Sequence, residues 1–340
     1  MELRMGHSDF DRGLAKLAAA YDILGPVRQS GTGRFSDTDV IGYGPVAGLS
    51  ELVLDEKSYF SPKEAVFPVR ETLFRFSGSS VEETEGPKRP VLLILRPCDI
   101  NGIQRLDTIY LHNGPVQDPY YRRRRENLKL LMLECTQGFD TCFCVSMGSN
   151  RADAWDGALR VEAGEVRLNL RDEALAAGFE GLGTEAAFEP AFIEANRTQV
   201  TVPPPEKVTK AHFDHPLWQE YTQRCIHCGR CNTSCVTCSC FTMQDVLYDE
   251  SGQLGERRRR WAGCHVDGFT DMAGGHAFRK KDGERMRFKT MHKINDFHRR
   301  FGAHMCVGCG RCDDVCPEYI SFSKCINKLN TIIEEEAHDE

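Results

Sequence analysis

The chain has 340 residues, and 50 acidic residues against 43 lysines and arginines leave a formal net charge of -7. This balance argues against binding nucleic acid or an anionic membrane surface through overall charge. The longest apolar runs have the length of a strand and not of a membrane span. Since the N-terminus also lacks the pattern of a secretory signal, we expect a cytoplasmic protein of about two domains, with no nucleic-acid or membrane partner.

The first part of the chain mixes helix and strand patterns. An amphipathic helix is expected to begin near Phe10 and to end at Gly25-Pro26. The short apolar runs Val91–Leu95 and Leu128–Leu133 predict buried strands. The alternating segment Arg160–Leu170 predicts a hairpin, and two helical stretches are expected after it. Together these elements predict an N-terminal mixed α/β domain.

The proline-rich segment 203–206 has the composition of a linker. We therefore predict an α+β chain with two domains, residues 1–205 and residues 206–340. Helical patterns are expected at 215–223 and 317–335, so the second domain is predicted to be mainly helical.

Two copies of one cysteine pattern, C-x-x-C-x-x-C-x-x-x-C, lie in the second domain, at 225–235 and at 306–316. Three thiolates on one tight loop can bind three irons of a single [4Fe-4S] cube, and the fourth cysteine of each motif ligates the other cube. The pattern predicts a ferredoxin-like domain with two [4Fe-4S] clusters that share ligands crosswise. The expected ligands are Cys225, Cys228, Cys231 and Cys316 for cluster 1, and Cys306, Cys309, Cys312 and Cys235 for cluster 2.

Structural zinc and disulfides are the alternatives for these eight cysteines. Zinc sites usually combine two C-x-x-C or C-x-x-C/His units across a longer gap, whereas each loop here has a third cysteine at the same short spacing. Disulfides need an oxidising compartment, which the missing secretory signal does not indicate. We therefore expect iron–sulfur clusters.

The two motifs are separated by much more chain than in a minimal two-cluster ferredoxin. The insertion, residues 241–300, is rich in arginine, glycine and histidine. It could form a partner surface, tune the clusters through hydrogen bonds to sulfur, or shield them from solvent. Of these roles we expect shielding.

Four cysteines of the first domain form a second constellation. Two follow the expected core strands, where ligand sites of open α/β sheets gather, and two form a C-x-C pair in a loop with glycine. They are candidates for a third [4Fe-4S] cluster, and free cysteines packed as small hydrophobes are the alternative. These four are Cys98, Cys135, Cys142 and Cys144.

Four other cysteines have no assigned role: Cys238, Cys240, Cys264 and Cys325. Among them Cys238 competes with Cys235 as a ligand, because Val236 replaces the proline that commonly follows the fourth cysteine of such a motif.

The residues predict an intermediary and not a complete enzyme, with no catalytic residue of its own. There is no G-x-G-x-x-G between a strand and a helix, and the nearest match, Gly42-x-Gly44, is followed by Pro45. A nicotinamide or flavin site is therefore not expected in this chain.

Several segments, together with the double cysteine motif, resemble the iron–sulfur electron-transfer subunit of the anaerobic sulfite reductase family. The segments are GRFSDTDVIGYG at 33–44, LRPCDINGIQRLDTIY at 95–110, DPYYRRRRE at 118–126 and ECTQGFDTCFCVSMG at 134–148. The likeness covers nearly the whole chain. Much of it is shared with the related beta subunits of soluble sulfhydrogenases, while GRFSDTDVI resembles the sulfite-reductase branch.

This resemblance implies an electron-transfer subunit for sulfite reduction in anaerobic respiration, and it favours the third cluster. Electrons would come from an FAD-containing subunit that oxidises NADH and would leave to a sirohaem subunit that reduces sulfite to sulfide. The alternative is the electron-transfer beta subunit of a soluble nickel–iron hydrogenase or sulfhydrogenase. A third hypothesis is a non-enzymatic protein whose clusters are structural or sense oxygen and whose basic runs, 122–125 and 257–260, contact nucleic acid. It fits the acidic chain least.

Overall fold

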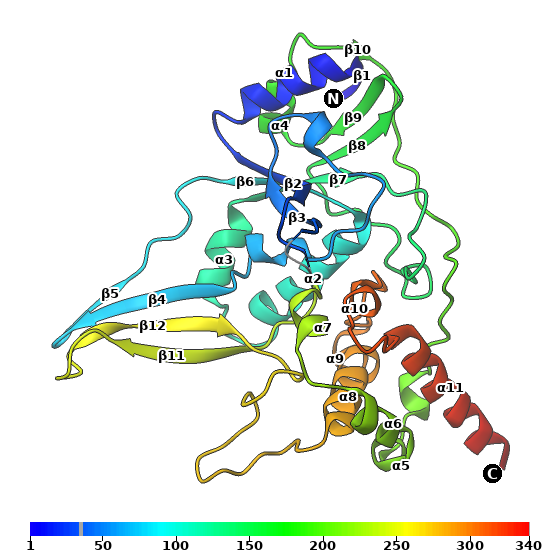
Figure 1. Cartoon of the computed structure of the whole chain (residues 1–340). Coiled ribbons are helices and arrows are strands. Elements are labelled where there is room, and N and C mark those ends of the chain that lie inside the picture. Colours follow the sequence, from blue (N-terminus) through cyan, green and yellow to red (C-terminus); the bar gives the residue numbers. More distant parts are fainter. Residues whose placement is uncertain (34–36, 340) are drawn as a thin grey trace. The chain divides into compact units, whose positions relative to one another are not determined.

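The computed structural model describes residues 1–33 and 37–339, and Figure 1 shows its elements. Contacts group the chain into two compact units. Unit 1 comprises residues 1–67, 86–140 and 148–196, and unit 2 comprises residues 68–85, 141–147 and 197–340. The boundary between residues 205 and 206 stays a prediction. That prediction did not anticipate that two earlier segments, 68–85 and 141–147, would join unit 2.

Unit 1 is built on an eight-stranded mixed sheet with the order β10-β1-β9-β8-β7-β6-β2-β3. The four central strands, β8, β7, β6 and β2, run parallel, and the outer strands pair antiparallel. The strands are β1 (Glu2–Gly6), β2 (Asp22–Gln29), β3 (Val40–Pro45), β6 (Val91–Leu95), β7 (Leu128–Leu133), β8 (Gly157–Glu162), β9 (Glu165–Leu170) and β10 (Thr184–Glu185).

The two strands predicted from apolar runs are confirmed as β6 and β7. They are parallel neighbours, with Leu95 opposite Met132. Both are almost fully buried, which is why their sequences are continuous apolar runs. Helices α2 (Pro97–Leu111) and α3 (Pro119–Glu126) connect them. The carboxyl ends of β6 and β7 therefore lie at the same edge of the sheet.

The predicted first helix is present but ends early. Helix α1 spans His7–Leu17, and Gly25 and Pro26 lie inside β2. Strand β2 pairs with β6 only over Asp22–Leu24, and beyond that point this side of β2 has an isolated bridge from Val27 to Leu52 in place of a full strand partner. Proline is tolerated in such a strand. The prediction that Gly25-Pro26 ends the helix was therefore wrong.

The predicted hairpin at 160–170 is confirmed as β8 and β9, which pair antiparallel. Within residues 171–204, all of them described, one helix follows in place of two. This helix, α4 (Glu173–Gly178), is capped by Asp172, whose carboxylate accepts a hydrogen bond from the Leu175 amide at 3.0 Å. Its neighbour Phe179 stacks on Phe10 of α1, with 5.8 Å between the ring centroids.

Unit 2 contains an antiparallel sheet with the order β11-β12-β4-β5. Its strands are β4 (Arg70–Ser77), β5 (Ser80–Glu83), β11 (Phe241–Leu247) and β12 (Leu254–Trp261). The insertion supplies β11 and β12, while β4 and β5 come from the sequence before β6. This pairing explains why segment 68–85 belongs to unit 2.

The basic run 257–260 lies on β12, where acidic neighbours compensate it. Arg257 makes two hydrogen bonds to Asp245, at 2.7 and 2.8 Å. Arg259 is only 2% exposed and lies 2.8 Å from Glu71 of β4. The run therefore contributes to the pairing of the two hairpins.

Unit 2 has a second apolar core that includes Trp218, Tyr221, Met286 and Leu329. The helices of this unit are α5 (Lys210–Asp214), α6 (Leu217–Arg224), α7 (Arg230–Thr233), α8 (Asp282–Met291), α9 (Phe297–Phe301), α10 (Arg311–Asp314) and α11 (Phe322–Asp339). A π-helical turn, η4 (His292–Asp296), joins α8 to α9. Short 3-10 turns are η1 (Leu49–Glu51) and η2 (Pro62–Ala65) in unit 1 and η3 (Pro205–Lys207) in unit 2.

None of the helices in residues 1–33 and 37–339 has both the length and the apolar character that crossing a bilayer requires.

Candidate metal centres

The first cysteine motif forms the loop between α6 and α7. Cys225 caps the carboxyl end of α6, and its amide donates to the carbonyl of Tyr221 at 3.0 Å. His227, inside the loop, lies 3.1 Å from Asp282 at the start of α8. The loop is thus held between α6 and the helical part of the insertion.

The four predicted ligands of cluster 1 line one cavity, although they come from both motifs. Cys225, Cys228 and Cys231 border it together with Cys316, and Cys312 borders it as well. Three residues of the insertion also line it: His265, Met286 and Lys289. Residues of the predicted insertion thus form part of the wall of this cavity, and its shielding role stays a prediction.

Burial dominates the electrostatics of these thiols. It raises the pKa of Cys225 to about 11. Burial likewise raises the pKa of Cys231, and the nearby ammonium of Lys289 opposes that rise. A cysteine binds iron as a thiolate, so binding of a cluster at this site requires these thiols to lose their protons. Burial opposes that loss because it raises the pKa of the thiols.

The second motif packs directly against segment 141–147. Its glycines 308 and 310 have φ angles of 60° and 72°. A Cβ at Gly308 would lie 2.5 Å from the backbone of Phe143, and one at Gly310 would lie 2.2 Å from the carbonyl oxygen of Thr141. The Phe143 amide donates to the Gly308 carbonyl at 2.7 Å. Only glycine permits both the positive φ angles and the close approach of the two backbones. This packing explains why segment 141–147 belongs to unit 2.

The predicted ligands of cluster 2 also influence one another. Burial raises the pKa of Cys306 to about 12, the Lys293 ammonium opposes the rise, and Cys235 and Cys309 add to it. Cys235 comes from the first motif, and its sulfur accepts a hydrogen bond from Lys293 Nζ at 3.4 Å. The pKa of Cys312 is raised by burial and further by neighbours that include Cys306 and Cys309.

This arrangement fits a thiolate-ligated cluster better than a single ion. Among residues 1–33 and 37–339, no three His, Cys, Asp or Glu side chains are placed to hold one metal ion. In a cubane each thiolate binds a different iron, so the four cysteine ligands of one cluster do not need to converge on a single metal ion. Each crosswise set combines three thiols of one loop with a thiol of the other.

The four candidates for a third cluster are divided between the units. Cys98, at the start of α2, and Cys135, after β7, belong to unit 1, whereas Cys142 and Cys144 belong to unit 2. The sulfur of Cys135 lies 3.8 Å from Arg96 Nη1, and the sulfur of Cys142 lies 3.7 Å from the Cys309 carbonyl oxygen. The third cluster stays a prediction.

Two of the unassigned cysteines share a partner that the sequence did not reveal. Asn232 is buried inside the first motif, and its amide nitrogen lies 3.5 Å from the sulfur of Cys238 and 3.4 Å from that of Cys264. Its side-chain oxygen accepts from the His265 amide at 3.0 Å. Asn232 thus ties the motif loop to the insertion. By contrast, Cys325 is fully buried in the apolar core of unit 2.

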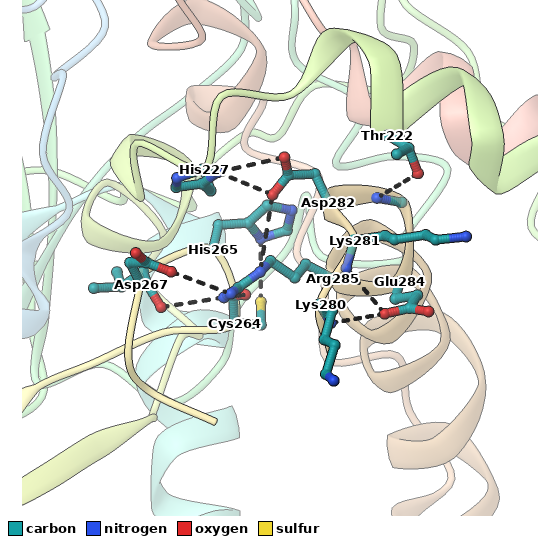
Figure 2. A network of polar contacts seen from close by, with 12 residues as sticks. Thr222, His227, Cys264, His265, Asp267, Lys280, Lys281, Asp282, Glu284 and Arg285 are labelled. Atoms are coloured by element: carbon teal, nitrogen blue, oxygen red, sulfur yellow. Dashed lines mark hydrogen bonds and ion pairs between the residues drawn. The ribbon is translucent and has the colours of Figure 1, made fainter. Parts of the chain in front are cut away.

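Figure 2 shows the hydrogen bonds and ion pairs that hold the insertion beside the first motif. Asp282 lies between His227 and Arg285, at 3.1 and 3.8 Å. The Arg285 guanidinium donates to the carbonyls of Cys264 and Val266 at 3.2 and 3.3 Å. Burial lowers the pKa of His265 to about 3, so this cavity-lining imidazole is neutral at physiological pH.

Two comparisons with known proteins agree with this geometry. A family model described as a 4Fe-4S dicluster domain matches residues 224–320. Sulfhydrogenase 2 subunit beta of Pyrococcus furiosus is 31% identical over 324 residues, which cover 90% of this chain and 92% of the relative. This chain belongs to the sulfhydrogenase beta-subunit family. It is an iron–sulfur electron-transfer protein, and the prediction of two [4Fe-4S] clusters is confirmed. The comparisons support the predicted resemblance to sulfhydrogenase beta subunits and do not specifically support the predicted resemblance to the sulfite reductase subunit.

Proposed function

We propose that this chain is the electron-transfer beta subunit of a soluble, cytoplasmic hydrogenase-type complex. The two clusters would relay electrons between a flavin subunit that reacts with NADH and a nickel–iron subunit that reacts with hydrogen. The observation that carries this proposal is the likeness of 90% of the chain to a sulfhydrogenase beta subunit. It corresponds to the alternative function predicted from the sequence and not to the first choice.

The second candidate is the electron-transfer subunit of an anaerobic sulfite reductase, in which the electron acceptor is a sirohaem subunit. The segment GRFSDTDVIGYG at 33–44 favours it. Its residues 34–36 lie outside the described residues, and the rest leads into β3 of unit 1.

Within either complex, the chain's own residues would bind the clusters, exclude water and orient the loops. The proposed ligands are Cys225, Cys228, Cys231 and Cys316 for one cluster, and Cys306, Cys309, Cys312 and Cys235 for the other. Each cluster, when bound, accepts and donates single electrons. Glycines 308 and 310 admit the backbone of segment 141–147, which covers the second motif.

Purification of the intact complex under anaerobic conditions through a tag on this chain separates the two candidates. The hydrogenase proposal predicts stoichiometric nickel and hydrogen-dependent reduction of NAD⁺. Sirohaem bands and NADH-dependent reduction of sulfite, with no nickel, would instead establish the second candidate. Recovery of neither partner with a cluster-loaded chain would refute both.

The Cys309→Ala variant tests the relay itself. We expect loss of electron transfer between NADH and the catalytic subunit, while NADH still reduces the flavin, because the proposed break lies after the flavin. Cys325→Ala is the matched control, since Cys325 is buried in the core and is not a proposed ligand. Normal turnover in the Cys309→Ala complex would contradict the assignment.

The third cluster is proposed at Cys98, Cys135, Cys142 and Cys144. With four irons in each cubane, the isolated chain should contain about twelve irons if this set binds a cluster and about eight if it does not. The Cys135→Ala variant should then lose about four irons relative to the parent chain. An iron content that this substitution leaves unchanged would disprove the third site.

A further inference from the structure

Two lysines on one continuous helical segment are almost completely buried. Lys289 of α8 is 4% exposed and Lys293 of η4 is 3% exposed. Lysine is almost never fully buried without a partner of opposite charge. Within the part of the chain that the structure describes, no carboxylate forms an ion pair with either ammonium. Both charges therefore require another anion.

Lys293 connects the end of the first motif with the start of the second. Its ammonium donates to Thr237 Oγ1 at 2.7 Å and to Cys235 Sγ at 3.4 Å. Its backbone carbonyl accepts from the amides of Met305 and Cys306, at 2.9 and 3.3 Å. The charge of Lys293 is thus held beside the thiols proposed for cluster 2.

Lys289 lies one helical turn earlier and faces thiols of both motifs. It lines the cavity that Cys225, Cys228, Cys231 and Cys316 border, and Cys312 of the other set lines the same cavity. Its ammonium lies 4.6 Å from the centroid of the Phe322 ring, which covers it from the side of α11. The charge of Lys289 therefore lies close to both proposed ligand sets.

A buried ammonium is costly unless an anion compensates it, and thiolates bound to a cluster supply such negative charge. Reduction adds one further negative charge to the cluster. A fixed positive charge nearby stabilises the reduced form more than the oxidised form, so it raises the reduction potential. The low polarity of a buried site strengthens this effect, because solvent screens the interaction little.

We propose that Lys289 and Lys293 set the reduction potentials of the two clusters. Lys289 raises the potentials of both, and Lys293 raises that of the cluster at Cys235, Cys306, Cys309 and Cys312. This inference rests on the proposed ligand sets. It adds that these two buried cations adjust how readily each cluster accepts an electron.

The test is an EPR-monitored redox titration of the anaerobically purified full-length chain and of its Lys289→Met and Lys293→Met variants. Lys293→Met should lower one midpoint potential, and Lys289→Met should lower both. We expect at least a tenfold change in the ratio of reduced to oxidised cluster at fixed potential, which equals about 59 mV for one electron. Lys280→Met, which removes an exposed charge before the same helix, should leave both potentials unchanged.

Glutamine variants separate charge from hydrogen bonding. Lys293→Gln keeps a donor for Thr237 without the charge, so it should lower the potential as Lys293→Met does. Unchanged potentials in the methionine variants, or a shift with methionine but not with glutamine, would overturn the proposal. So would loss of iron in both variants of either lysine, because the role would then be structural. Iron content and potentials of the isolated chain do not depend on which partner subunits it serves, so failure here is distinct from failure of the proposed function.

Discussion

Replacing Gly310 by alanine tests whether segment 141–147 packs on the second cysteine motif. Gly310 has a φ of 72°, where a residue with a side chain costs about 1–2 kcal/mol. The added Cβ would also lie 2.2 Å from the carbonyl oxygen of Thr141, an overlap with backbone that must be relieved by movement. Overpacking of this kind costs about 1–3 kcal/mol more. The expected loss of stability is therefore about 2–5 kcal/mol.

Gly302 provides a matched control in the same unit. Its φ is 73°, and a Cβ there would meet nothing within 4 Å, so Gly302→Ala should cost only the conformational part, about 1–2 kcal/mol. Thermal unfolding of the cluster-loaded chains, followed by circular dichroism without oxygen, gives the comparison. At about 2–4 °C per kcal/mol, Gly310→Ala should lower Tm by roughly twice as much as Gly302→Ala. Equal losses would refute the proposed contact with Thr141.

Two other outcomes are expected. Arg259→Met should destabilise the chain by about 3–5 kcal/mol, because it breaks a largely buried ion pair with Glu71. Arg257→Met, which breaks the exposed pair with Asp245, should cost much less, and equal losses of Tm in the two variants would contradict this reasoning. Cluster incorporation into the apoprotein should speed up from pH 7 to pH 9, because burial raises the pKa of Cys225 to about 11 and of Cys306 to about 12. Below those values the thiolate fraction rises about tenfold per pH unit, so a reconstitution rate that does not change with pH would count against this reasoning.

Local patterns predicted some elements well because they depend on a few adjacent residues. The apolar runs at 91–95 and 128–133 matched β6 and β7 to the residue, since strands buried on both faces carry an unbroken apolar signal. The prediction that Gly25-Pro26 ends the first helix was wrong for the same reason, because it depended on a few adjacent residues alone. As a local signal it marks a helix end, but whether a strand can accommodate it depends on which side of that strand lacks a continuous strand partner.

The burial and contacts of the residues around the candidate metal centres were much harder to predict from the sequence. In the sequence, Lys289 and Lys293 look like the many lysines of solvent-exposed helices, and nothing near them marks them as buried. Asn232 could be noticed only as an amide within a cysteine loop. The contact of Asn232 with Cys264 spans 32 residues and that of Lys293 with Cys235 spans 58, so no local pattern encodes them.

The cysteine spacing alone established the cofactor, because three thiols within seven residues can reach three irons whatever surrounds them. Tertiary structure decided what encloses each centre. It brought Cys316 to the cavity of the first loop, laid segment 141–147 against the second, and buried two ammonium groups beside the thiols. Ligand type is a property of a short stretch of chain, whereas burial and fixed charge arise only when distant segments pack together.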